Sequence, residues 1–321
     1  MRALVTGAAG FVGSHVVRAL RQEGHEVTGT ALTVEDAVRS EAKGLAPCDV
    51  RDASAVEAIV RNTRPTHVFH LAAQSSAALS WRDPHLTYEV NVTGTHHLLD
   101  AVRRHSPEAR VLVAATSDEY GIVDPESCPI DESAPLRPVS PYAASKVAEE
   151  WVGRMFHEAF GLQVVVTRAF MHIGPGQPPS FATADWARQI ARAELGLQAP
   201  RVSVGNLELA REFGDVRDVT AAYMAVIDAG VAGEAYNVAT GEPHKLREAL
   251  DVLTGRASVD IDVVVDPAKI RPADPPLLTG SSAKLERLTG WKPVHRFEDT
   301  LSAVLDYWRA QAGSQQEARG S

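Results

Sequence analysis

The stretch "RALVTGAAGFVG" (residues 2–13) predicts the fold of this chain. An apolar strand pattern runs into a glycine-rich turn, and a helical pattern follows at once. Gly7, Gly10 and Gly13 suit a dinucleotide-binding turn, which needs a tight turn, close approach of the backbone to a pyrophosphate, and close packing of helix on strand. A glycine-rich turn without a ligand is the alternative, and the strand–turn–helix context makes it the weaker one.

The rest of the first half repeats this alternation. Apolar runs lie at residues 25–30, 44–49, 66–72, 110–116 and 163–170. Helical patterns lie at residues 11–23, 53–61, 84–105 and 142–160. Continuous apolar runs are typical of parallel strands that are covered on both faces. The sequence therefore predicts an α/β fold with a Rossmann-type, doubly wound parallel sheet.

The alternation stops after residue 170, where a loop rich in Gly and Pro begins. Further helical patterns lie at 183–195 and 216–229, and a strand pattern lies at 234–239. We expect a dinucleotide-binding domain of residues 1–170 that also receives about 215–239. A smaller C-terminal α/β substrate domain would take residues 171–214 and 240–312. The polar end, residues 313–321, is predicted to be disordered.

Composition excludes several classes of function. The chain has 321 residues, of which 45% are hydrophobic and 23% charged, with a net charge of -9. These values favour a globular protein without a nucleic-acid or membrane footprint. There is no signal-peptide pattern and no apolar run of bilayer length. Cys48 and Cys128 lack metal-ligand spacing, so we expect reduced thiols, no metal site and a cytoplasmic location.

The end of the second strand bears on the choice of dinucleotide. An acid that binds the ribose 2′-OH is expected there. Residues 30–33, beginning with Thr30, fill this window, and the first acids are Glu35 and Asp36. No carboxylate is placed to repel a 2′-phosphate, although no arginine is placed to bind one. We therefore favour NADP(H), with NAD(H) as the alternative. Asp49, after the third strand, is a candidate partner of the adenine edge or a simple turn aspartate.

The stretch "SPYAASKVAEEW" (residues 140–151) carries the candidate chemistry. Tyr142 and Lys146 are four residues apart, so they share one helix face. A lysine ammonium favours the phenolate and would bring the phenol pKa, ordinarily about 10, towards neutrality. An exposed helical pair is the alternative, and it would be preferred if the pair stood alone. Thr116, Ser117 and Asp118 follow the fifth strand, where a hydroxyl can bind a substrate carbonyl at the same crevice.

Together these motifs resemble the extended short-chain dehydrogenases/reductases that modify nucleotide sugars. The resemblance covers about residues 1–310 and rests on "TGAAGFVGSH", "HLAAQSS", "NVTGTHHLLDA", "TSDEYG", "SPYAASK", "YNVATGE" and "HIGPGQ". The phrases "GPGQ", "GNLE", "RPAD" and "GWKP" point further, to the GDP-mannose branch of 4,6-dehydratases and 4-keto-6-deoxy-sugar reductases. Enzymes of this kind form homodimers through two long helices, which here would be 84–105 and 142–160.

The resemblance implies roles for individual residues. Thr116, Tyr142 and Lys146 would be catalytic, with Asp118 as a further candidate. The nucleotide sugar would contact Ser75, Ser76, Ser117, Asn206, Arg211 and Arg271, the arginines because guanidinium groups match phosphate oxygens. Arg217 is instead a candidate structural partner of Asp215 or Asp218. The cofactor would be lined by Gly7, Gly10, Phe11, Val12, Gly13, Thr30, Asp49, Val50, Leu71, Ala72, Ala73, Asn91 and Lys146.

Two positions depart from the family pattern. Met171 stands where "RxFNHxGPGQ" has an asparagine, so the contact with the nucleotide sugar would differ. Asp118 stands where the dehydratases place a glutamate that takes the C5 proton. It is one methylene shorter, and reaction geometry is sensitive at that scale.

The shorter side chain of Asp118 favours a reductase, which does not need that base. It would use NADPH to reduce the C4 ketone of a GDP-4-keto-6-deoxy-hexose to a GDP-6-deoxyhexose of the GDP-rhamnose type, with Tyr142 as proton donor. A GDP-mannose 4,6-dehydratase with Asp118 or Glu119 as base, and an epimerase of nucleotide sugars, are the alternatives. A non-catalytic dinucleotide sensor is less favoured because Tyr142 and Lys146 are both present.

Overall fold

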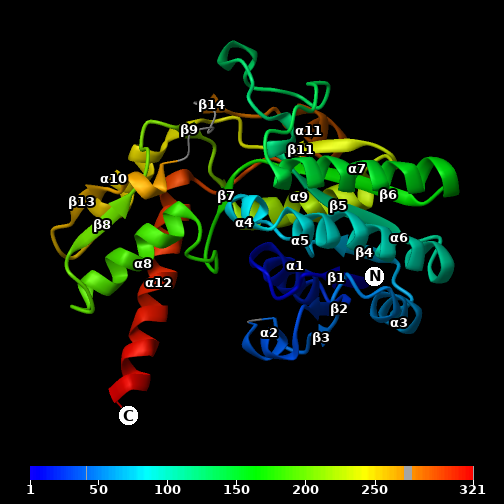
Figure 1. Cartoon of the computed structure of the whole chain (residues 1–321), viewed down its shortest axis with the longest axis horizontal. Helices are drawn as coiled ribbons and strands as arrows, with labels where there is room; N and C mark the ends of the chain where they lie inside the picture. The colour runs from blue at the N-terminus through cyan, green and yellow to red at the C-terminus, as the bar shows by residue number, and fades with distance from the viewer. Residues whose placement is uncertain (41, 271–276, 321) are drawn as a thin grey trace.

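The computed structural model describes residues 1–40, 42–270 and 277–320. Within these residues the main element is a seven-stranded parallel sheet in the order β11–β6–β5–β4–β1–β2–β3 (Figure 1). Its strands are β1 (Arg2–Thr6), β2 (Glu26–Ala31), β3 (Ala46–Pro47), β4 (His67–His70), β5 (Arg110–Thr116), β6 (Gln163–Ala169) and β11 (Ala235–Val238). The strand order reverses between β1 and β4, and in such sheets ligands bind at the carboxyl ends beside this point. The predicted fold class is confirmed.

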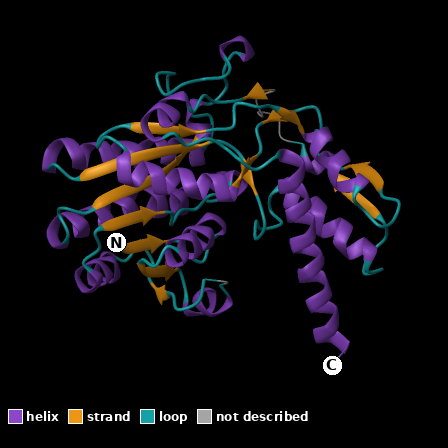
Figure 2. Ribbon diagram, turned by 180° about the vertical axis from the view of Figure 1, so that it is seen from behind, coloured by secondary structure: helices purple, strands orange, loops and turns teal. Residues whose placement is uncertain are grey.

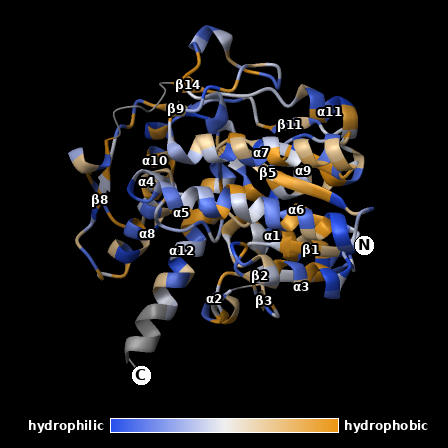
Figure 3. Cartoon of the chain, turned by 45° about the vertical axis from the view of Figure 1, so that its right-hand side comes forward, coloured by the Kyte–Doolittle hydropathy of each residue, from blue (hydrophilic) through white to orange (hydrophobic). Residues whose placement is uncertain are grey.

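Helices cover both faces of the sheet (Figure 2). One face carries α1 (Phe11–Gln22), α9 (Val216–Ala229) and α11 (Ala283–Thr289). The other carries α3 (Ala53–Thr63), α6 (Gly94–His105) and α7 (Pro141–Phe160). The central strands are almost continuously buried, as their apolar sequences require. Figure 3 shows the same pattern, with apolar residues concentrated on the strands.

The long helical pattern at 84–105 is not one regular α-helix. It divides into α5 (Pro84–Tyr88), a π-helical turn η1 (Glu89–Thr93) and α6. Asn91 lies in the wide turn, where its amide accepts from the Gln74 backbone N–H at 2.8 Å and donates to Ser145 Oγ at 2.9 Å. The π-turn therefore ties this helix to α7 and to the loop after β4. Such turns are frequent at functional sites.

A second set of elements is built mainly from the C-terminal half. The helices α8 (Ala182–Glu194), α10 (Leu246–Gly255) and α12 (Phe297–Gly320) share an apolar cluster with β8 (Arg201–Val204). Short strands complete this part: β7 (His172–Ile173), β9 (Ala210–Arg211), β10 (Gly214–Asp215), β12 (His244–Lys245), β13 (Asp262–Val265) and β14 (Leu277–Leu278). The chain enters this part after β6, returns to the main sheet with α9 and β11, and leaves again. The domain boundaries given above stay a prediction.

Several elements differ from expectation. The short helices α2 (Val34–Arg39) and α4 (Ala77–Arg82) were not predicted, because six residues are too few to show a helical period. The run at 44–49 forms only a two-residue strand, β3. α12 continues to Gly320, whereas a disordered tail was predicted from residue 313. Its Gln, Glu and Arg residues are polar enough to suggest disorder, yet these residue types, like Ala, are strong helix formers.

Candidate active site

The glycine turn lies where β1 ends and α1 begins. Gly7 has a φ of 68°, and a Cβ atom at this position would lie 2.7 Å from the backbone nitrogen of Ala72, after β4. A Cβ at Gly13 would lie 2.2 Å from the carbonyl oxygen of Gly7. α1 begins at Phe11, and no side chain of the described residues caps its N-terminus. Backbone N–H groups at this end are therefore available for a pyrophosphate.

Thr116 and Tyr142 meet at the carboxyl edge of the sheet. Thr116 is the last residue of β5, and Tyr142 lies in the first turn of α7. Ser140 fixes the start of this helix, since its Oγ accepts from the Ala143 backbone N–H at 3.1 Å. The Thr116 side chain lies close enough to Tyr142 to lower the pKa of its phenol. A strand end and a capped helix start thus place the two hydroxyl groups together.

The Tyr142 phenol is protonated at neutral pH. Burial raises the pKa of the Tyr142 phenol well above its usual value, and the charges of Asp118 and Glu149 act in the same direction. The neighbouring Thr116 side chain acts the other way. The sequence had suggested a phenol whose pKa is brought down by Lys146. The structure differs because burial of the phenol is the largest effect on its pKa, and the Lys146 ammonium lies against a carboxylate.

That carboxylate belongs to Glu149, which the sequence analysis missed. Lys146 Nζ donates to Glu149 Oε2 at 2.5 Å, and the two side chains are only 3% and 1% exposed. Burial raises the pKa of Glu149 to about 7, although Lys146 acts to lower it. Glu149 follows Lys146 by three residues on a helix, a spacing at which side chains meet. This spacing was the signal available in the sequence.

Two neighbouring acids that the sequence left as alternative bases have different environments. Asp118 is exposed, and its charge acts on Tyr142. Glu119 is wholly buried and lies 3.5 Å from the guanidinium of Arg168 on β6. Burial raises the pKa of Glu119 well above its usual value, and the charge of Glu150 adds to this. Glu119 is therefore an internal residue, and Asp118 is the exposed acid of the two.

A chain of buried polar side chains runs beneath Lys146. His70 on β4 is hydrogen-bonded at 2.8 Å to Thr6 Oγ1 on one side and to Thr95 Oγ1 on the other. Thr95 in turn donates to the backbone carbonyl of Asn91 at 2.6 Å. Burial, together with the charge of Lys146, lowers the pKa of His70 to about 3. His70 is therefore neutral and positions its neighbours without adding charge.

The other residues predicted to line the cofactor lie at the strand ends. Thr30 is buried near the end of β2, and Val50 is buried after β3. The backbone N–H groups of Leu71 and Ala72 donate to Thr6 Oγ1 at 3.2 and 3.3 Å. The Asp49 carboxylate is held by Arg51 at 2.6 Å, and this contact lowers its pKa. Val12 in α1 and Ala73 after β4 are half-buried, and Phe11 stacks on His172 at 5.9 Å between ring centres.

The residues predicted to face the sugar are distributed over two loops. Ser75 is exposed in the loop after β4, and Ser76 caps α4 by accepting from the Leu79 backbone N–H at 3.2 Å. Ser117 is buried, beside Thr116. Ser76 therefore has a structural role at the start of α4 in addition to its predicted contact with the sugar.

The predicted diphosphate and base contacts lie in the C-terminal part. Arg211 is half-buried in β9 and donates to the carbonyl of Ala210 at 2.7 Å. Asn206 is exposed, and its side chain accepts from the Glu208 backbone N–H at 3.0 Å. Arg271 lies outside the described residues. Arg217 forms the structural pair considered above, since its Nε lies 2.8 Å from Asp215 Oδ1.

Met171 has a structural explanation. Its half-buried side chain packs against the apolar cluster that α8, α10 and α12 share. Its backbone carbonyl accepts from the Gly214 N–H at 3.0 Å, beside the pairing of β7 with β10. An apolar side chain at this position therefore stabilises the C-terminal part, where an amide would need a polar partner.

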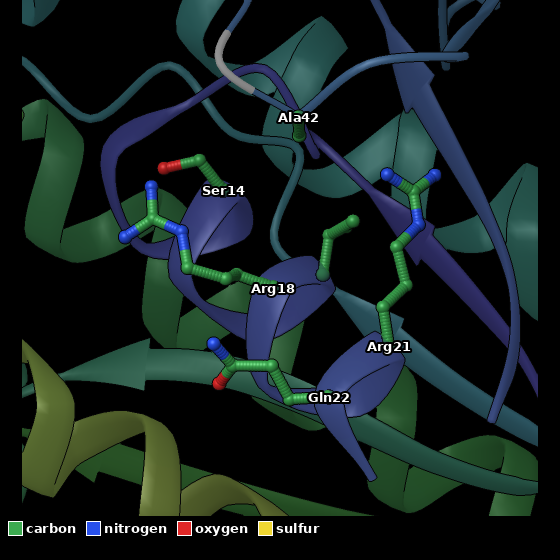
Figure 4. Close-up of a pocket in the computed structure, with 6 residues that line it drawn as sticks. Ser14, Arg18, Arg21, Gln22 and Ala42 are labelled. Atoms are coloured by element: carbon green, nitrogen blue, oxygen red, sulfur yellow. The ribbon is translucent and has the colours of Figure 1, made fainter. Parts of the chain in front are cut away.

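A separate surface pocket lies beside α1 (Figure 4). It has a volume of about 270 Å³. Figure 4 shows the Arg18 side chain extending towards Ser14. The lining residues are Ser14, Val17, Arg18, Arg21, Gln22 and Ala42. They include no predicted site residue, although Ser14 follows Gly13 directly.

The strand order, the glycine turn and the Thr116–Tyr142–Lys146 set at one sheet edge define the class of the protein. They are the features of an extended short-chain dehydrogenase/reductase. More narrowly, the chain belongs to the family described as GDP-mannose 4,6 dehydratase, whose family model matches residues 4–304. The resemblance seen in the sequence is confirmed. In the described residues, no group of His, Cys, Asp and Glu suited to a metal ion was found, and no helix is long and apolar enough to cross a bilayer.

Individual relatives agree with this assignment. The chain is 40% identical over 247 residues to GDP-6-deoxy-D-mannose reductase of Pseudomonas aeruginosa. The matched residues make up 77% of this chain and 81% of the relative. It is 32% identical to GDP-mannose 4,6 dehydratase 2 of Arabidopsis thaliana, over 95% of this chain and 86% of the relative. A solved structure of RMD from Pseudomonas aeruginosa complexed with NADPH superposes with a TM-score of 0.86 and 34% identity. That match covers 97% of this chain and 100% of that chain.

Proposed function

We propose that the protein uses NADPH to reduce the C4 ketone of a GDP-4-keto-6-deoxy-hexose to a GDP-6-deoxyhexose. The observation that carries this proposal is that Thr116, at the end of β5, and Tyr142, in the first turn of α7, lie together at the carboxyl edge of the sheet. The similarity to GDP-6-deoxy-D-mannose reductase and to a structure complexed with NADPH supports the substrate class and the cofactor. NAD(H) is the alternative cofactor.

The proposed chemistry needs one hydride and one proton. NADPH supplies the hydride to C4 when it is bound. The Tyr142 hydroxyl holds the proton and gives it to the ketone oxygen as the charge on that oxygen develops. A phenol with a raised pKa is protonated before the reaction, as this role requires. Thr116 orients the carbonyl against Tyr142, and Lys146 holds the nicotinamide ribose.

The proposed binding residues divide along the chain. The backbone N–H groups after Gly10 bind the pyrophosphate of the cofactor at the open end of α1. Arg211 and Arg271 bind the diphosphate of the nucleotide sugar, and Asn206 contacts its base or ribose. Ser75, Ser76 and Ser117 face the sugar.

The first test follows the nicotinamide absorbance. NADPH and GDP-4-keto-6-deoxy-mannose are mixed with the purified protein, and we expect one NADPH to be consumed for each ketone. Tyr142→Phe should lower kcat by about 10²–10⁴-fold, since it removes the proton donor and leaves the ring in place. A matched control is Tyr307→Phe, because Tyr307 is a half-buried tyrosine on α12, outside the proposed site. Equal activity of Tyr142→Phe and the wild type would contradict the proposal.

A 4,6-dehydratase is the second candidate, favoured by one observation. Asp118 is exposed two residues after Thr116, where a base for the C5 proton would stand. Such an enzyme would convert GDP-mannose without net consumption of reductant. We expect no conversion of GDP-mannose in the absence of added reductant, measured by chromatography of the nucleotide sugars. Conversion that is lost in Asp118→Asn would establish the dehydratase instead.

We also propose a homodimer in the cytoplasm. Large apolar side chains are exposed on α4, α5 and α7, which pack together along one side of the molecule. They are Trp81, Tyr88, Trp151 and Met155. Apolar side chains of this size gathered on neighbouring helices are typical of a protein–protein contact. The cytoplasmic location is supported by Cys48 and Cys128, which are both free thiols.

A further inference from the structure

Glu149 has no part in the chemistry proposed above, yet it holds a group that does. The Lys146 ammonium lies 2.5 Å from Glu149 Oε2, and both side chains are buried. The second carboxylate oxygen, Oε1, has no hydrogen-bond partner among the described residues. The pair is therefore held by a single strong contact, and Glu149 depends on Lys146 for its charge balance.

We propose that Glu149 is a positioning residue that releases the Lys146 ammonium when NADPH binds and takes up a proton in its place. This inference rests on the proposed function, because it assumes that Lys146 turns towards the nicotinamide ribose. The step is balanced: the Lys146–Glu149 hydrogen bond breaks, a Lys146–ribose hydrogen bond forms, and one proton from solvent binds the carboxylate.

The charges around the pair favour this exchange. A buried carboxylate without a partner is costly, so it binds a proton rather than stay ionised. Lys146 is the charged group that acts on Glu149, and Glu149 in turn acts on Tyr142. His70 from β4 and Glu119 from the turn after β5 also face Lys146. His70 is neutral and Glu119 has its own cation in Arg168, so neither group replaces Lys146 as the partner of Glu149.

The affinity for NADPH should depend on pH, because Glu149 takes up a proton when NADPH binds. Glu149 has a pKa of about 7 when Lys146 is its partner, and this pKa rises when Lys146 leaves. The complex then binds one more proton than the free protein at pH values above about 7. The affinity for NADPH should therefore fall as the pH rises through this range, by up to about tenfold for each pH unit.

The test measures proton uptake directly. NADPH is titrated into the protein by calorimetry at about pH 8, in two buffers with different ionisation enthalpies. The 2′-phosphate, with a pKa of about 6, is ionised under these conditions and adds little. We expect the wild type to take up about one proton for each NADPH bound. Glu149→Gln should take up none and should bind with an affinity that does not change with pH.

Two further variants separate this role from a purely structural one. Glu149→Asp keeps a titratable carboxyl and should keep the proton uptake. Glu158→Gln removes an exposed acid on the same helix and should behave as the wild type. Binding of NADPH without proton uptake, or unchanged uptake in Glu149→Gln, would overturn this inference and leave the proposed function standing. Failure of the wild type to bind NADPH would overturn the proposed function with it.

Discussion

Arg168 balances the buried charges behind the catalytic residues. Its guanidinium contacts Glu150 at 2.9 and 2.7 Å and Glu119 at 3.5 Å, and it donates to the Tyr120 hydroxyl at 3.0 Å. Glu119 and Glu150 are both almost wholly buried. Loss of the cation would leave the buried Glu150 carboxylate without two of its hydrogen bonds, which is more costly than the loss of an exposed pair.

We predict that Arg168→Met lowers the free energy of unfolding by about 3–5 kcal/mol. Urea denaturation would measure this change. The matched control is Arg154→Met, because Arg154 pairs with the same Glu150 at 2.8 Å but is partly exposed. We expect that control to cost less than about 1 kcal/mol. Equal losses in the two variants would contradict this account of Arg168.

The loss of stability in Arg168→Met should depend on pH. Burial raises the pKa of Glu119 in the folded protein, so folding favours the protonated carboxyl. The cost of burying its charge is absent below the ordinary pKa of a glutamate and grows as the pH rises towards the folded-state pKa. Without Arg168 this pKa rises further. The loss of stability in Arg168→Met should therefore be smaller at about pH 5 than at about pH 8.

Residues of the site differ in how far the sequence could predict them. Thr116 is recognisable because it ends a strand of the sheet. Tyr142 and Lys146 are recognisable because they lie four residues apart at the start of a helix. The opposite orientations of Asp118 and Glu119 depend on a short helical turn, Ser117–Tyr120, which directs one side chain outward and the other to Arg168. That orientation is set by tertiary packing, which adjacent letters in a sequence do not encode.

At the scale of elements, α7 serves two surfaces. One face carries Tyr142, Lys146 and Glu149 towards the interior, and another exposes Trp151 and Met155. A single rigid helix would therefore link the proposed dimer contact to the proposed active site. Loss of the dimer contact should therefore affect the active site as well as the assembly.

We predict that Trp151→Glu converts a dimer into monomers, because Trp151 is 61% exposed within the proposed contact and the substitution replaces its apolar surface with a charge. Light scattering after size-exclusion chromatography measures the mass. Val294→Glu is the control, since Val294 is an exposed apolar residue in the segment before α12. A monomeric wild type, or a dimer that persists in Trp151→Glu, would exclude this interface.

Strands and helices were predicted with unequal success for a physical reason. The strands of the sheet are apolar on both faces, so their composition alone marks them. The π-turn η1 was hidden because one wide turn leaves the surrounding apolar pattern almost unchanged. Asn91 was predicted to touch the cofactor, and its contacts with Gln74 and Ser145 show a bridging duty that no pattern indicated.

At the scale of the whole molecule, Glu212 joins segments that are distant in sequence. Its buried carboxylate accepts hydrogen bonds from the backbone N–H groups of Thr240, Gly241 and Gly280. These residues follow β11 and β14, so one side chain connects the main sheet with the C-terminal part. An N–H group that is buried without a partner costs about 1–3 kcal/mol.

We predict that Glu212→Ala lowers the free energy of unfolding by about 2–4 kcal/mol, since several buried N–H groups lose their acceptor together. Thermal and urea unfolding would measure it. Glu242→Ala, which removes an exposed acid two residues after Thr240, should change stability little. A loss no greater than that of the control would show that the carboxylate does not join the two parts.

The order of strands also has a consequence for synthesis. β6 pairs with β5 on one side and with β11 on the other, and residues 170–234 separate β6 from β11 in the chain. While the ribosome makes those residues, β6 remains an open sheet edge, which other chains can pair with. The N-terminal part is made first, but it lacks β11, the strand that covers the free edge of β6. Expression of residues 1–170 alone should therefore yield aggregates, and the nascent chain has a defined interval in which a chaperone would protect it.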